Sequence, residues 1–317
     1  MPIIDFLSIN LTELLTYFDD ANKRIFWLYI TSAMVLAIPV YWFSYKSHSI
    51  KGFFFYIFPK KIYTSRSAKH DYALLVINKL IKAALFPLFI FTMAPIALWV
   101  TSVMETLFGE RNFMTLQPAT IMMTFTVFLF IFDDFTRFYL HYILHRISFL
   151  WEFHKVHHSA EVLTPFTIYR SHPVESYLYA CRMALTQGFV VGVCYYFFGP
   201  TLKMIDILGA NLFVFLFNFL GSNLRHSHIW LSWGDKIEKW WISPAQHQIH
   251  HSNKPRFQHT NFGSALAIWD RFFKTHTKAS QIDELTFGIA DERVDHSSLA
   301  KIYFQPFVAI ANRIKSK

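Results

Sequence analysis

The sequence is poor in cysteine and in charged residues. Its 317 residues include two cysteines, Cys181 and Cys194, which form no CxxC pattern. This scarcity argues against a disulfide framework and against a zinc site built on thiolates, and both cysteines are expected to be buried thiols. Charged residues make up 16% of the chain, whereas an ordinary soluble domain has about 25%. The composition therefore argues against a soluble protein with one large core.

Acidic residues are outnumbered by basic ones, 21 against 30, which gives a formal charge of +9. The basic residues lie between apolar runs, so we expect anionic lipid headgroups, and no nucleic acid, as their partners. Residues 1–24 lack the basic start and the apolar core of a cleavable signal peptide. No internal repeat or low-complexity linker divides the chain.

Apolar residues account for 53% of the chain, with 36 phenylalanines among them, and they are concentrated in long runs. Such runs are typical of helices that span a bilayer, so we predict an all-α, multipass membrane fold with about four to five apolar segments. Gly199-Pro200 separates the last two segments, which indicates a tight helical hairpin. The five segments are approximately residues 25–45, 81–103, 118–132, 177–198 and 202–220.

The orientation follows from charge. Residues 46–82, which we expect to form a loop, carry eight basic residues and one acid, Asp71. The positive-inside rule places this loop in the cytoplasm and the N-terminus outside. Counting crossings from there puts residues 222–317 in the cytoplasm as a compact helical cap. All of the histidine clusters described next then lie on the cytoplasmic side.

Histidine is the residue whose distribution is most informative. Eleven of the sixteen histidines fall between residues 141 and 251. Clustered neutral imidazoles are the ligands with which proteins hold ions such as Fe, Zn, Cu or Ni. The three clusters are His141-x-x-x-His145, His154-x-x-His157-His158 and His247-x-x-His250-His251.

The spacing within the clusters predicts a dinuclear metal site. Residues four apart share a helix face, so His141 and His145 can bind one ion. A triplet spaced i, i+3, i+4 can supply one ligand to one ion and two ligands to its neighbour. The eight clustered histidines are too many for one ion, which takes roughly four to six ligands. Asp134 lies two helical turns before His141 and is expected to orient a ligand imidazole.

Three further histidines lie near the clusters. His226 is predicted to be a ligand. His228 follows it at i+2 and would share the site only where the backbone is irregular. His172, within Arg170-Ser171-His172-Pro173, is either a ligand or a partner of one. The predicted metal ligands are therefore His141, His145, His154, His157, His158, His226, His247, His250 and His251, with His228 as a further candidate.

At these residues the sequence resembles the fatty acid hydroxylase/sterol desaturase superfamily of membrane-bound histidine-box di-iron oxygenases, whose pattern is HxxxH, HxxHH and HxxHH. The resemblance covers residues 118–275, which we take as the catalytic region between an N-terminal transmembrane region at 1–117 and a cytoplasmic tail at 276–317. Flanking residues also carry it: Asp134-Phe135, LWEFHKVHHS at 150–159, RSHPVE at 170–175, NFG at 261–263 and WDRFF at 269–273.

The resemblance implies a chemistry. Two iron ions, which zinc can replace in a purified sample, activate dioxygen with two external electrons and attack an unactivated C–H bond of a lipid. No haem-binding or ferredoxin-like segment is visible, so we expect a separate electron-donor protein of the ferredoxin or cytochrome b5 type. The short chain without a fused donor favours a bacterial inner membrane over the endoplasmic reticulum.

Alternative functions remain open at this point. The histidine pattern does not distinguish a lipid hydroxylase from a lipid desaturase or an ether-lipid monooxygenase. A divalent-metal transporter would place ionisable residues at mid-membrane depth, whereas these histidines follow the apolar runs. A structural zinc site is closed, four-coordinate and often contains cysteine, which does not match this set. Fatty acyl, sterol and related substrates would all suit an aromatic-rich apolar pocket.

Overall fold

The computed structural model describes residues 2–44, 49–89, 92–282, 284–291 and 295–315. Within these ranges the chain is mostly helical, and its strands are the two-residue β1 (Asp206–Ile207) and β2 (Ala210–Asn211). The prediction of an all-α protein is confirmed.

Three helices are long and apolar enough to cross a bilayer: α2 (Trp27–Ser44), α5 (Arg66–Phe89) and α7 (Pro118–Arg146). At 1.5 Å per residue, even α2 is about 27 Å long, close to the roughly 30 Å of a hydrocarbon core. The predicted class of helical membrane protein is therefore confirmed, with three candidate spans in the described part of the chain. A helix α1 (Ile3–Leu15) and a turn η1 (Thr16–Phe18) precede them.

Two expectations about the first third of the chain are wrong. The segment 46–82 is not a loop, because it contains α3 (Ile50–Ile57), α4 (Lys60–Tyr63) and most of α5. The apolar run 81–103 is not one helix, because α5 ends at Phe89 and α6 (Met93–Phe108) begins at Met93. A hydropathy average reports composition over a window, and it detects neither a helix that starts in a polar stretch nor a break inside an apolar one.

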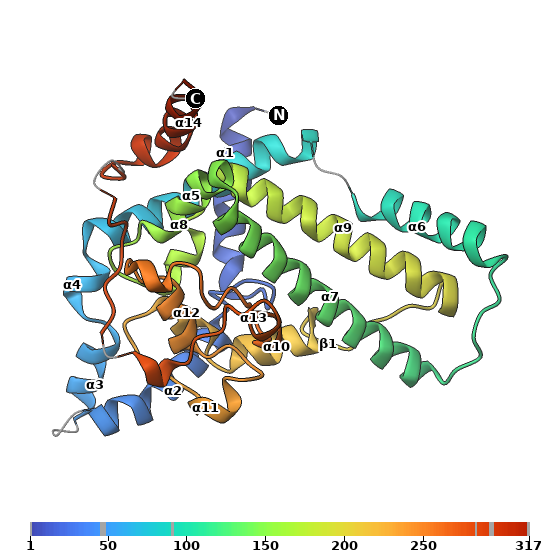
Figure 1. Ribbon diagram of the computed structural model, residues 1–317, viewed down its shortest axis with the longest axis horizontal. Helices are drawn as coiled ribbons and strands as arrows, with labels where there is room; N and C mark the ends of the chain where they lie inside the picture. Colours follow the sequence, from blue (N-terminus) through green and yellow to red (C-terminus); the bar gives the residue numbers. More distant parts are fainter. Residues whose placement is uncertain (1, 45–48, 90–91, 283, 292–294, 316–317) are drawn as a thin grey trace.

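Helix α9 (Pro173–Phe198) packs closely along α6, as Figure 1 shows. Glycines make this approach possible. A Cβ atom on Gly188 would lie 2.6 Å from the Cβ of Ile96, and one on Gly192 would lie 2.7 Å from the carbonyl oxygen of Ala97. Small residues four apart on one face are a common means of bringing membrane helices together.

The predicted hairpin of two long helices after Gly199-Pro200 is wrong. The chain instead forms a small antiparallel pair in which Asp206 lies opposite Asn211, and then the eight-residue helix α10 (Leu212–Phe219). Such a helix is about 12 Å long and cannot cross a bilayer. The apolar run 202–220 is partly extended chain, so its length in residues overstates its helical length.

Short elements connect and cover the long helices. Figure 1 shows α8 and α12 beside the C-terminal half of α7. These elements are α8 (Ser148–His158), η2 (Pro165–Tyr169), η3 (Ser222–His226), α11 (Gly234–Ile237), α12 (Pro244–His250), η4 (Pro255–Phe257), α13 (Ile268–Phe272) and η5 (Ala279–Gln281).

The final helix α14 (Leu299–Lys315) contains Pro306. It lies within the segment 276–317 that the sequence analysis sets apart as a tail, yet it is attached to the rest of the molecule. Ile302 is fully buried against Leu74 of α5 and Val156 of α8. The helix therefore braces the element that carries the second histidine cluster.

Replacing Gly192 with valine is expected to destabilise the protein by about 1–3 kcal/mol, because the added side chain would overlap the backbone of α6. The measurement is the midpoint of thermal unfolding in detergent. Leu185→Ile, on an exposed position of the same helix, is the matched control and should leave the midpoint unchanged. Equal midpoints for both variants would contradict the close packing of α6 on α9.

Candidate metal centre

Five histidines from three helices converge to form the first histidine group. The nitrogen atoms that can bind a metal all lie within 4.8 Å of one another, and every ring is buried. The group consists of His141 and His145 of α7, His154 and His158 of α8, and His250 of α12.

Four histidines form the second histidine group beside the first. Their candidate ligand atoms also lie within 4.8 Å of one another. Three of the rings are buried, and that of His157 is half-buried. The rings of His158 and His251, one from each group, stack with centroids 4.8 Å apart, so the two groups are adjacent. The members are His157 of α8, His226 of η3, His247 of α12 and His251 just after it.

Helical spacing explains how each triplet divides between the groups. On α8, His154 and His158 are four apart and face the first group, whereas His157 faces the second. On α12 the division is reversed. His247 and His251, which are four apart, belong to the second group, whereas His250 belongs to the first. Two neighbouring helices therefore each contribute to both groups.

The ring nitrogens fit metal ions better than they fit one another. In the first group, the Nε2 atoms of all five rings are buried without a hydrogen-bond partner among the described residues. Buried polar atoms are normally paired, so five convergent unpaired nitrogens indicate a missing partner. A transition-metal ion accepts such lone pairs, and imidazole is a ligand that suits iron and zinc.

The second group has too few N–H groups for its nitrogen–nitrogen contacts to be hydrogen bonds. The Nε2 atom of His226 lies 3.1 Å from that of His247, 3.1 Å from that of His251 and 3.4 Å from that of His157. A neutral imidazole carries one N–H, and His157 donates its own from Nδ1 to the carbonyl oxygen of Arg170 at 3.1 Å. These contacts therefore cannot all be hydrogen bonds, and a bound cation would satisfy the facing lone pairs.

In several of the rings, protein groups fix which nitrogen points inward. The Nδ1–H of His141 donates to the carbonyl oxygen of Phe262 at 2.9 Å, and that of His250 donates to Thr260 at 2.8 Å. His154 donates to the carboxylate of Glu175 at 2.9 Å. Such partners set the tautomer and orientation of a metal-binding imidazole and leave Nε2 free for the ion.

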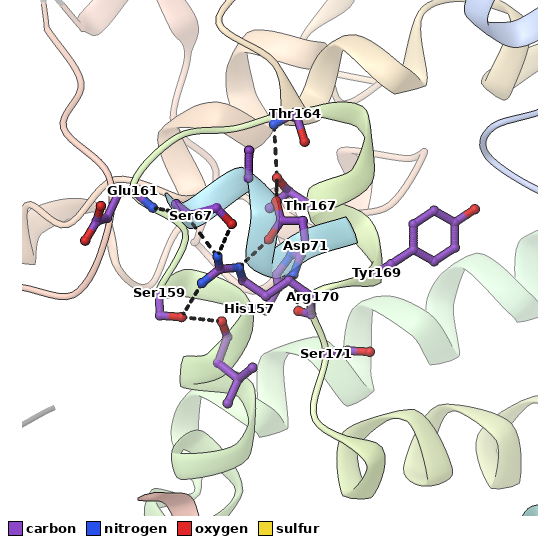
Figure 2. A network of polar contacts seen from close by, with 12 residues as sticks. Ser67, Asp71, His157, Ser159, Glu161, Thr164, Thr167, Tyr169, Arg170 and Ser171 are labelled. Atoms are coloured by element: carbon purple, nitrogen blue, oxygen red, sulfur yellow. Dashed lines mark hydrogen bonds and ion pairs between the residues drawn. The ribbon is translucent and has the colours of Figure 1, made fainter. Parts of the chain in front are cut away.

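The carbonyl that holds His157 belongs to a tightly fixed residue. Arg170 is 1% exposed, and Figure 2 shows its guanidinium enclosed by hydrogen bonds. It donates from Nε to Asp71 at 2.6 Å, from Nη1 to the hydroxyl of Ser159 at 2.9 Å, and from Nη2 to the carbonyl of Ser67 at 2.8 Å. The network joins α5 to the end of α8 and so positions the backbone on which the His157 ring depends.

The imidazoles outside the candidate spans are neutral at physiological pH. Burial lowers the pKa of His154 to about 3 and that of His157 to about 4. Burial, followed by neighbouring charges, also holds the pKa values of the others well below the usual range: His158, His226, His247, His250 and His251. Neutral rings are the form that binds a metal.

Asp134 has different partners from those expected. Its carboxylate forms no hydrogen bond with an imidazole of the described residues. Its oxygens accept from the backbone N–H of Ala265 at 2.8 Å, from that of Leu266 at 3.1 Å, and from Trp269 Nε1 at 2.9 Å. The helical spacing to His141 is correct, but the carboxylate reaches across to the loop that follows Phe262. Asp134 thus acts on the histidines through this loop.

His172 and His228 lie outside both histidine groups. His172 caps the start of α9, where its Nδ1 accepts from the N–H of Val174, and its Nε2–H donates to the carbonyl of Tyr303 at 3.1 Å. The Nε2–H of His228 donates to the carbonyl of Tyr56 in α3 at 2.6 Å. The two imidazoles therefore have different surroundings, since the ring of His226 faces His247 and that of His228 faces α3.

Sequence reasoning missed Glu175 and Arg225 as site residues. Glu175 lies in the first turn of α9, where an acid is expected merely to favour the helix dipole. Arg225 is 5% exposed and donates from Nη2 to Nδ1 of His247 at 2.8 Å. Its place beside His226 was the available signal, although adjacency in sequence does not reveal where a side chain points.

A cavity of about 270 Å³ reaches both histidine groups. His141 and His154 of the first group line it together with His157, His226 and His247 of the second. The residues that line this cavity are mostly polar or charged, in contrast to the aromatic-rich apolar pocket that was expected. Burial lowers the pKa of Arg24 to about 10 and that of Arg225 to about 9, so both lining guanidiniums stay charged at neutral pH.

Comparison with known proteins agrees with this geometry. Residues 125–275 match the fatty acid hydroxylase family. The resemblance inferred from the histidine clusters is thereby confirmed.

Curated relatives share the same region. Over 174 residues the chain is 27% identical to an ornithine lipid hydroxylase of Rhizobium tropici, a match that covers 55% of this chain and 47% of that protein. It is 22% identical over 182 residues to an alkylglycerol monooxygenase of Caenorhabditis elegans, covering 56% of this chain and 32% of the relative. The corresponding Danio rerio protein is 27% identical over 158 residues, covering 49% and 31%. The matches thus span less than half of each relative, and no solved structure is significantly similar to this chain.

Asp71→Asn should destabilise the protein by about 3–5 kcal/mol, because the Arg170 charge would stay buried without its counter-ion. Thermal unfolding in detergent measures the effect. The control, Asp235→Asn, breaks a solvent-screened ion pair with Lys278 and should leave the unfolding midpoint nearly unchanged. Similar losses for the two variants would show that the network of Figure 2 does not hold the site.

Proposed function

We propose that this chain is a membrane-bound di-iron oxygenase that hydroxylates an unactivated C–H bond of a lipid with dioxygen and two external electrons. The observation that carries the proposal is the pair of adjacent histidine groups, whose inward-facing nitrogens lack sufficient protein partners. Bound there, two irons would supply the activation of dioxygen that attack on such a bond requires. The names of the relatives, a lipid hydroxylase and alkylglycerol monooxygenases, support a lipid as substrate.

The residues around the first histidine group keep water away from the reaction. The ring of Phe262, itself 1% exposed, lies 5.0 Å from that of His145 and 5.5 Å from that of His141, centroid to centroid. Trp151 lies 4.7 Å from His145 in the same way. Excluding water protects a reactive site from side reactions, which a hydroxylase of unactivated carbon needs.

We further propose that the histidines face the cytoplasm of a bacterial cell. The orientation expected from the sequence required residues 202–220 to span the membrane, which they do not do. The proposal now depends on α3, which follows α2 in the basic segment and whose Tyr56 accepts a hydrogen bond from His228. The basic residues between α2 and α5, among them Lys51, Lys60 and Lys61, therefore lie on the same side as His228, and the positive-inside rule assigns that side to the cytoplasm. A separate donor protein there would supply the electrons.

Metal analysis is the first test. The full chain, purified anaerobically after iron-replete growth, should contain about two irons per chain, with a coupled signal in Mössbauer spectra of iron-57 material. His145→Ala and His251→Ala, one from each group, should each lower the iron content to about one per chain or less. His228→Gln lies outside both groups and should retain the wild-type content. One metal or none in the wild-type protein would sink the di-iron proposal.

Product mass distinguishes the related reactions. The metal-loaded protein, supplied with dioxygen, reductant and membrane lipid, should yield a lipid that has gained one oxygen atom. Loss of two hydrogens would instead identify a desaturase, and cleavage of an ether bond would identify an ether-lipid monooxygenase. His157→Ala should abolish every such product, because its ring belongs to the second histidine group and lines the cavity.

A further inference from the structure

The cavity beside the histidines collects positive charge from distant parts of the chain. Four basic residues line it: Arg24 before α2, Lys82 of α5, Arg137 of α7 and Arg225 of η3. Glu175 is the acid in its lining. This carboxyl already accepts a hydrogen bond from His154 at 2.9 Å. The cavity, which we call the cationic cavity, therefore has a clear excess of positive charge.

Three of the four cations lack a counter-ion among the described residues. Arg137 pairs with Asp133 at 2.9 Å. No described carboxylate lies within 4.0 Å of the charged nitrogens of Arg24, Lys82 or Arg225. Isolated charges that lose water without gaining an anion are costly.

Two of the cations, Arg24 and Arg225, contact the same aromatic ring. Their guanidinium carbons each lie 5.4 Å from the centre of the Phe217 ring. Arg225 is 5% exposed, and its Nε is buried without a hydrogen-bond partner. Like charges gathered around one ring, with an unused donor, are the arrangement expected of a site that receives an anion.

We propose that the cationic cavity binds a phosphate-bearing headgroup of the lipid whose C–H bond is attacked. This inference rests on the proposed function and specifies its substrate class. Phosphate is favoured over carboxylate because three uncompensated cations match its greater charge and its larger number of acceptor oxygens. The volume of about 270 Å³ accommodates a headgroup but not a whole lipid, so the tail extends outside it.

The same arrangement restricts the position of attack. Arg225 both lines the cavity and donates to His247 of the second histidine group, so the headgroup site and the histidines are in direct contact. A headgroup held there brings its nearest carbons, rather than the far end of the tail, beside the two groups. The hydroxyl group should therefore appear close to the headgroup, which fragmentation of the product in a mass spectrometer would show.

Binding to the purified full chain tests the proposal without turnover. The probes are a short-chain lysophosphatidate, the monoacylglycerol with the same acyl chain, and inorganic phosphate, each titrated by calorimetry in a neutral detergent. Lysophosphatidate should bind at least about tenfold more tightly than either of the others, since it alone combines tail and phosphate. Its affinity should fall as salt is added.

Two variants and one control locate the effect. Lys82→Gln and Arg24→Gln should each weaken lysophosphatidate binding about tenfold and leave monoacylglycerol binding unchanged. Lys79→Gln, on the same helix as Lys82 but paired with Glu13 outside the cavity, should have no effect. Unfolding midpoints and metal content identify a variant that has merely misfolded. Lys82 is the safer position, because Arg24 also donates hydrogen bonds to Asn218 and Ser222.

The outcomes separate this inference from the proposed function. Equal affinity for lysophosphatidate and monoacylglycerol would overturn the headgroup site, even if two irons and a hydroxylated product are found. Inorganic phosphate binding as tightly as lysophosphatidate would show a site for free phosphate and also overturn it. Selective binding that is lost in Lys82→Gln would support the headgroup site whatever the metal analysis finds.

Discussion

Burying nine imidazole rings in one region imposes the constraint on which the rest of the structure depends. Each ring must be uncharged, because its surroundings penalise an imidazolium, and each must also direct one chosen nitrogen inward. A protein acceptor for the other nitrogen meets the second requirement in four of the rings. For His141, His157 and His250 this acceptor is a backbone carbonyl, and for His154 it is the Glu175 carboxylate. The site is therefore only as well defined as the loops that carry those carbonyls.

Buried carboxylates hold these loops. Asp71 fixes Arg170, whose carbonyl accepts from His157. Asp270 accepts from the N–H groups of Phe262 and Gly263 at 2.8 and 2.7 Å, and Asp134 holds the residues that follow. Glycine is required in this loop, since a Cβ atom at Gly263 would lie 2.8 Å from the Asp270 carboxylate. The carboxylates near the centre thus mainly accept hydrogen bonds from backbone N–H groups. This explains why the motifs around the histidines include Asn-Phe-Gly at 261–263 and Trp-Asp at 269–270.

The sequence allowed the local parts of this arrangement to be predicted and left the long-range parts hidden. Spacing of i, i+3 and i+4 is a property of one helix, so the division of each triplet between two histidine groups could be predicted before any coordinates. Hydropathy located α2 and the start of α7, but it misjudged 202–220, where composition alone does not distinguish a helix from extended chain. The partners of Asp134 and the positions of Glu175 and Arg225 depend on contacts between separate elements, which no spacing rule encodes.

The shape of the site favours catalysis over a structural metal role. A structural ion is enclosed by its ligands, and nothing else needs to reach it. Here one cavity is lined by His141 and His154 of the first group and by His226 and His247 of the second, so both groups face the same space. Its charge also separates it from the surrounding apolar helices, which are suited to the tail of a lipid but not to its headgroup. A lipid can satisfy both environments at once, because its polar end can occupy the cavity while its tail remains among apolar side chains or in the bilayer.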